Sequence, residues 1–164
     1  MPSHRAYPAP ALYRHDFLRR IVLIRHLAFA VAGLALSVTG AAAQEVSVEF
    51  GAHIAIIGGC HDCHTVGYNE SAGQVDPNVA LKGNPTGFPG PWGTTFAKNL
   101  RLTLKDMSED DWVAYSDTFE TAPPMPWYNV HALTDVEARS LYQYIKSLPG
   151  DLGEQAPEAL PPPA

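Results

Sequence analysis

The stretch Gly58-Gly59-Cys60-His61-Asp62-Cys63-His64-Thr65 decides how this sequence is interpreted. It contains C-x-x-C-H, the pattern by which a c-type haem is attached to a protein. Two thiols three residues apart on one turn can each add to one vinyl group of the porphyrin, and the next histidine then lies under the iron. The motif therefore predicts thioethers at Cys60 and Cys63 and an axial iron ligand at His64. Because the motif occurs once, we expect one haem c.

Three other uses of the two cysteines compete with haem attachment. A Cys60–Cys63 disulfide would close a loop too short to stabilise the fold much. A redox pair of the thioredoxin type needs alternating strands and helices, which the sequence does not show. A zinc site needs four ligands, and only His53 and His61 are near. We favour haem attachment, and expect His61 and Asp62, at the variable positions, to face solvent.

The first 43 residues have the features of an export signal. Five arginines and one acid, Asp16, precede an uncharged apolar run over residues 27–38, and Ala41-Ala42-Ala43 follows. A positive region, a short apolar region and a small-residue cleavage site are typical of a secretory signal peptide. We therefore predict a cleaved signal peptide over residues 1–43 and a periplasmic protein. A retained membrane anchor over residues 27–43 is the alternative, at the short limit for a span.

The charge of the chain argues against some partners. The 164 residues carry 11 basic and 17 acidic side chains, a net charge of −6, and the length predicts one domain. Without residues 1–43 the net charge becomes −10. Such a surface repels nucleic acid and anionic lipid and attracts basic protein surfaces. We expect no nucleic-acid partner and, after signal removal, no membrane span.

Met125 is the favoured second axial ligand. It lies in Pro123-Pro124-Met125-Pro126, where three prolines restrict the backbone and make a stiff loop. The alternative for Met125 is a side chain that fills the core. Met107 precedes a helix start at Ser108 and is expected to pack against that helix instead. His131, just beyond the proline loop, is the other candidate ligand.

The remaining pattern predicts three helices and a long loop. Residues 46–58 fit either a helix or a strand, residues 109–119 fit a helix, and a third helix begins at Thr134 and ends before Pro149. The Pro-rich tail over residues 151–164 is expected to be disordered or extended. Residues 64–108 contain many glycines and prolines, which suits a loop that wraps a prosthetic group. The aromatic residues expected to pack on the porphyrin are Phe88, Trp92 and Phe96.

The chain resembles the class I c-type cytochromes, in particular single-haem periplasmic cytochromes and the cytochrome subunits of alcohol and related dehydrogenases. Residues 48–65, residues 91–100, and Pro124-Met125-Pro126-Trp127 with the closing helix carry the resemblance. At Ala52-His53 the chain departs from the Arg-Tyr that the family often has.

The resemblance implies an all-α, cytochrome c-like domain over residues 44–150, wrapped around one covalently attached haem. The first and last helices should cross closely, with Gly51 near Tyr144, and Met125 should be the distal ligand. The implied function is electron transfer between redox partner proteins, a donor dehydrogenase and an acceptor oxidase or reductase, without enzymatic activity. A tightly bound haem subunit of a dehydrogenase complex, and a ligand-binding or peroxidatic haem protein with an open sixth site, are the alternatives.

Overall fold

The computed structural model describes residues 44–162. The predicted signal peptide over residues 1–43 lies outside the described residues and stays a prediction. Within residues 44–162, no helix is long and apolar enough to cross a lipid bilayer.

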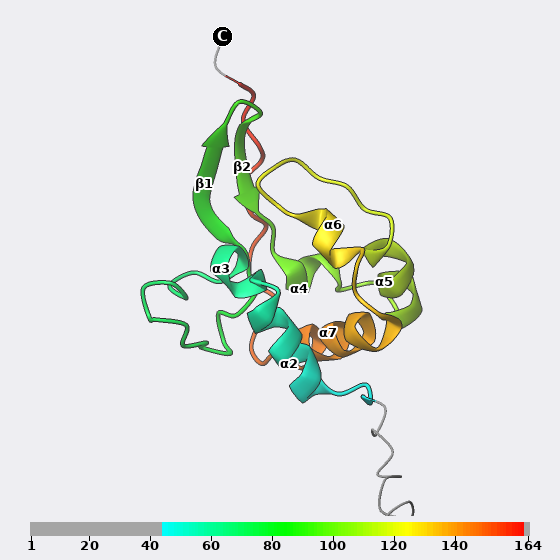
Figure 1. The fold of residues 1–164 in the computed structure, drawn as a ribbon. Coiled ribbons are helices and arrows are strands. Elements are labelled where there is room, and N and C mark those ends of the chain that lie inside the picture. The colour runs from blue at the N-terminus through cyan, green and yellow to red at the C-terminus, as the bar shows by residue number, and fades with distance from the viewer. Residues whose placement is uncertain (1–43, 163–164) are drawn as a thin grey trace, which may run out of the picture. The chain divides into compact units, whose positions relative to one another are not determined.

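The core is built on the crossing of two helices from opposite ends of this region, α2 (Val48–Ile57) and α7 (Asp135–Ser147) (Figure 1). Gly51 lies directly against the backbone carbonyl of Ser140 and the Cβ of Tyr144. The Ser140 hydroxyl also accepts a hydrogen bond from the Ser47 amide at 3.2 Å. Of the two structures that residues 46–58 could form, a helix or a strand, the helix is observed. Its glycine faces α7, and this close contact leaves no room for a side chain at position 51.

Both longer helices after the haem motif begin with the capping boxes that the sequence contains. At α7, Thr134 Oγ1 accepts from the Glu137 amide at 3.3 Å, and Glu137 Oε2 accepts from the Thr134 amide at 2.8 Å. Ser108 and Asp111 make the same exchange at α5 (Glu109–Ser116), which ends three residues before the predicted 109–119. Trp112 joins the two helices, since its indole donates to the Ala138 carbonyl at 2.8 Å.

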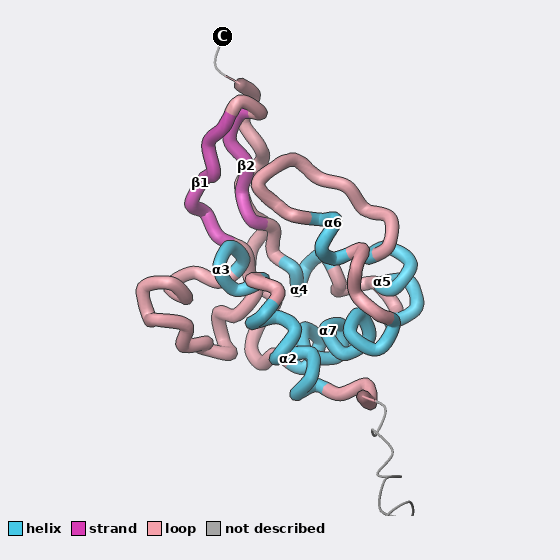
Figure 2. Tube along the Cα trace, viewed as in Figure 1, coloured by secondary structure: helices cyan, strands magenta, loops and turns pink. Residues whose placement is uncertain are grey.

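The prediction of an all-α fold is wrong for one segment. Strands β1 (Asn84–Gly90) and β2 (Gly93–Ala97) form an antiparallel hairpin (magenta in Figure 2). In the chain the hairpin comes after the short helix α3 (Cys60–His64) and before the short helix α4 (Leu100–Thr103). The physical reason is local, because threonines and Phe96 favour a pleated strand and the prolines of β1 can be accommodated on an edge strand. The short helix α6 (Trp127–Val130) follows the proline loop.

The chain after α7 runs in an extended conformation beside β2. Leu160 and Thr94 exchange two backbone hydrogen bonds, at 2.9 and 2.8 Å. The tail is therefore held against β2 at Leu160.

Replacing Gly51 by alanine should destabilise the fold, because the new methyl group would overlap the Ser140 carbonyl and lie 2.7 Å from the Tyr144 Cβ. We expect the free energy of unfolding to fall by about 1–3 kcal/mol, measured by urea denaturation followed by circular dichroism. Glu49→Ala, an exposed change on the same helix, should cost only a few tenths of a kcal/mol. Equal stabilities for Gly51→Ala and the unmodified chain would contradict the close crossing.

Candidate haem site

Helix α3 presents the C-x-x-C-H motif directly after α2. Gly59 separates the two helices with φ at +69°, a left-handed conformation that glycine adopts without strain. The chain therefore changes direction before Cys60, and α3 is not a continuation of α2. Cys60 and Cys63 are both free thiols and both half-buried. Burial raises the pKa of Cys60 to about 11, so that this thiol is protonated at neutral pH.

One ring nitrogen of His64 is hydrogen-bonded to the backbone, which leaves the other to bind a metal. It is 7 % exposed, and Nδ1 lies 2.6 Å from the backbone carbonyl oxygen of Lys98. That carbonyl can only accept, so Nδ1 carries the proton and the Nε2 lone pair points away from it. Burial lowers the pKa of His64 more than the Lys98 carbonyl raises it. The ring is therefore neutral, the form that binds a metal.

The prediction that His61 faces solvent is wrong. Its exposed fraction is 0 %, whereas Asp62 is exposed as predicted. His61 Nδ1 lies 2.8 Å from Thr65 Oγ1, and Nε2 lies 3.3 Å from the Tyr144 hydroxyl on α7. The Tyr68 ring packs on the imidazole with centroids 5.2 Å apart. Burial lowers the pKa of His61, which keeps the ring neutral. A five-residue helix has too little periodicity to reveal its buried face.

Met125 lies on the proline loop that precedes α6 and is half-buried. Strand β2 holds this loop, because Thr95 Oγ1 donates to the Pro123 carbonyl at 2.7 Å. The same strand leads directly into Lys98, whose carbonyl bonds to His64. One strand therefore connects to the loop that carries Met125 and to the carbonyl that bonds to His64.

His131 engages one ring nitrogen elsewhere, and the backbone of Met107 contacts α7. Nε2 of His131 lies 2.8 Å from the Phe119 carbonyl, and its ring packs edge-on against Phe119. The backbone carbonyl of Met107 accepts from the Tyr142 hydroxyl at 2.8 Å, which places Met107 beside α7.

Phe96 and Trp92 lie on the hairpin. Phe96 is half-buried on β2 across from Gly87. Trp92 is 37 % exposed at the β1–β2 turn and packs over Gly90, at the end of the hairpin remote from α3 (Figure 1). Contact of either ring with a porphyrin stays a prediction, and the place of the turn gives it no support for Trp92.

The residues of α3 fit a covalently attached haem. Two free thiols are spaced by one turn, and the adjacent neutral histidine has one nitrogen bonded to a carbonyl and the other available. Within residues 44–162, no three His, Cys, Asp or Glu side chains gather to hold a metal ion, so the zinc alternative lacks a ligand set there.

A comparison with protein families supports the same interpretation. The family model described as cytochrome c matches residues 48–149, more than half of the chain. No curated protein and no solved structure matches the chain at a significant level. The matched region begins with α2 and ends just after α7, so that it spans the crossing, the motif and the proline loop.

Removing the His61 side chain should destabilise the site. His61→Ala leaves a cavity and takes away the partners of Thr65 and Tyr144, for which we expect a loss of about 2–4 kcal/mol in the free energy of unfolding. Denaturant unfolding of the protein with its haem attached measures this loss. His53→Ala, which changes an exposed histidine on α2, should change stability by less than about 0.5 kcal/mol. An unchanged free energy of unfolding in His61→Ala would show that the buried contacts of this side chain do not form.

Proposed function

The chain belongs to the cytochrome c family, and from this premise we propose that it is a periplasmic carrier of single electrons with His64 and Met125 as axial ligands of one haem c. The family binds haem c covalently, and Cys60, Cys63 and His64 match its attachment motif. Its members generally carry electrons and are not enzymes. When bound, the haem supplies the Fe(III)/Fe(II) couple, and the protein contributes binding, orientation and shielding from water.

The observation that carries the proposal is the state of His64. A neutral, buried imidazole whose Nδ1 lies 2.6 Å from the Lys98 carbonyl oxygen keeps one orientation. A hydrogen bond of this kind fixes the tautomer and raises the basicity of the ligating nitrogen. A ligand that does not reorient suits electron transfer, in which little should move when the charge of the iron changes.

Two features of the distal side support Met125. Its loop is stiffened by prolines and attached to β2 through the 2.7 Å bond between Thr95 and Pro123. The alternative ligand His131 already engages Nε2 with a backbone carbonyl. Ligation by methionine and histidine raises the reduction potential of a haem, which suits a carrier in an oxidising compartment.

Met125→Ala should convert the iron from low spin to high spin, because a weak sulfur ligand is lost and no side chain replaces it. We expect the ferric protein to show a sulfur-to-iron charge-transfer band in the near infrared that disappears in the variant. The reduced variant should bind carbon monoxide rapidly, and the unmodified protein slowly.

Met107→Ala is the matched control, since it removes the other methionine after the initiator and should leave the band in place. A high-spin spectrum of the unmodified protein, unchanged by Met125→Ala, would contradict the proposal and favour the open-site alternative. Absence of covalent haem from protein made with haem-maturation machinery would overturn the haem assignment itself.

The acidic surface supports a basic protein partner. Arg139 already pairs with Glu109, Asp110 and Asp135, at 3.2, 2.8 and 2.9 Å. Lys82 and Lys105 pair with Asp151 and Asp106, and Arg101 is buried. Among the residues described, few cations remain to offset the other carboxylates, so the excess negative charge faces solvent. Such a field speeds the encounter with a basic surface and is screened by salt.

The rate of electron delivery to a basic redox protein should therefore fall as salt is added. Stopped-flow reduction of a basic cytochrome at about 10 mM and then 200 mM ionic strength should show at least a tenfold decrease in the bimolecular rate constant. An acidic acceptor of similar potential is the control and should not show the decrease. A rate independent of salt, or stable co-purification with one oxidoreductase at high salt, would contradict a freely exchanging carrier.

A further inference from the structure

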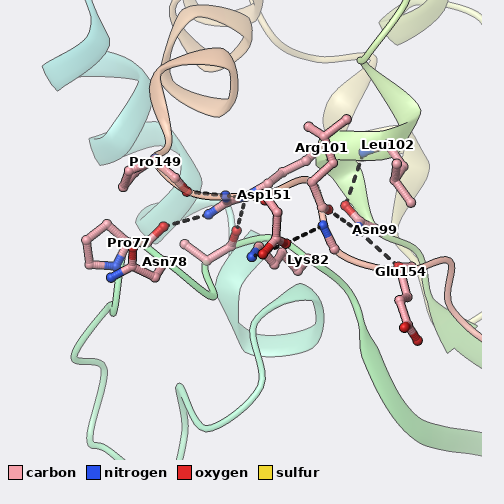
Figure 3. A network of polar contacts seen from close by, with 12 residues as sticks. Pro77, Asn78, Lys82, Asn99, Arg101, Leu102, Pro149, Asp151 and Glu154 are labelled. Atoms are coloured by element: carbon pink, nitrogen blue, oxygen red, sulfur yellow. Dashed lines mark hydrogen bonds and ion pairs between the residues drawn. The ribbon is translucent and has the colours of Figure 1, made fainter.

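The chain after α7 is attached to the domain mainly through backbone carbonyl groups. Arg101 on α4 is 4 % exposed, and its guanidinium donates to the carbonyls of Pro77, Ala80 and Pro149 at 2.6, 2.8 and 2.6 Å (Figure 3). This one side chain joins the loop after the haem motif to the segment that leaves α7. Lys82 adds an ion pair with Asp151 at 2.9 Å. We call residues 149–160 the C-terminal strap.

Asn99 connects the strap to the segment that follows β2. The side chain is 1 % exposed, and Nδ2 donates to the carbonyls of Leu152 and Glu154 at 2.7 and 3.0 Å. Oδ1 accepts from the Leu102 amide at 3.1 Å and so caps α4. Gly153, with φ at +74°, allows the strap to bend around the amide group. Both polar atoms of the Asn99 side chain therefore have partners, and both donor bonds go to the strap.

The peptide held by Asn99 is the one that bonds to His64. The Lys98 carbonyl, which lies 2.6 Å from His64 Nδ1, belongs to the same planar peptide unit as the Asn99 nitrogen. On the other side, the His64 carbonyl accepts from the Gly83 amide at 2.9 Å, and Gly83 follows the Lys82 that pairs with the strap. The strap thus restrains both segments that flank His64, although it does not contact His64 through any hydrogen bond described.

We propose that the C-terminal strap positions the hydrogen-bond acceptor of the proximal ligand through Asn99 and thereby holds down the reduction potential. The proposal rests on the assignment of His64 as an iron ligand. A short bond from Nδ1 to the Lys98 carbonyl makes the imidazole more basic, which stabilises the ferric state. If the strap is loosened, the bond between His64 Nδ1 and the Lys98 carbonyl lengthens and the imidazole becomes less basic. The ferrous state is then stabilised relative to the ferric state, and the reduction potential rises. Asn99 is a positioning residue in this scheme.

The test compares two ways of releasing the strap in the haem-loaded protein. Asn99→Ser keeps an oxygen that can cap α4 but lacks the Nδ2 group that makes both bonds to the strap. A truncation that removes residues 151–164 takes away the acceptors. We expect both changes to raise the midpoint potential, with a threefold to tenfold shift in the ferric/ferrous ratio, where tenfold corresponds to 59 mV. Exchange of the His64 Nδ1 proton with solvent, followed by NMR, should be at least tenfold faster.

A truncation that removes only residues 162–164 is the control, since it leaves every bond of the strap in place, and both readouts should stay unchanged. Unchanged potential and proton exchange in Asn99→Ser would overturn the proposal. A lower potential would also overturn it, because water entry favours the ferric state and would indicate general loosening. Should the truncated chain fail to fold, Asn99→Ser alone decides. Absence of haem, or of a paramagnetic shift at the His64 ring, in the unmodified protein would instead refute the proposed function.

Discussion

Backbone contact between Gly51 and Ser140 is the constraint on which the geometry of the site depends. It brings α2 and α7 closer than any side chain would permit, so the end of α2 has one position relative to α7. Because only Gly58 and Gly59 separate α2 from α3, that position also places the cysteines. His61 then bonds to Tyr144, one turn beyond Ser140, so α3 is held to the same helix against which α2 packs.

A second requirement shapes the side of the domain around His64: the backbone groups of its irregular segments need hydrogen-bond partners. Residues 65–83 and the strap have few helical or sheet bonds of their own, and buried carbonyls without partners are costly. Arg101 and Asn99 supply donors to these carbonyls, and His64 bonds to the carbonyl of Lys98 just after β2. These two irregular segments are therefore held by two polar side chains, where a regular element would use its own amides.

The sequence predicted the features that are local. The haem motif and the helix starts at Ser108 and Thr134 each depend on residues within a few positions. The pattern of residues 46–58 fitted a helix or a strand, and only the family resemblance favoured the helix. The hairpin was missed because glycines and prolines dominate β1 and hide its pairing with β2. Burial of His61 depends on Tyr144, 83 residues away. The strap bonds link side chains to carbonyls, which every residue has, so they leave no pattern in the sequence that could reveal them.

Added salt should affect the surface charges that attract a partner much more than the buried hydrogen bonds around His64. The bonds around His64 are buried and join mostly a donor to a neutral carbonyl, so added salt screens them little. The carboxylates of residues 44–162 are mostly exposed, and three of them pair with the same cation, Arg139. Ionic strength should therefore change how often a partner is met while leaving the ligand geometry intact. A change of rate with salt at constant midpoint potential thus reports on the encounter, whereas a change of potential reports on the proximal side.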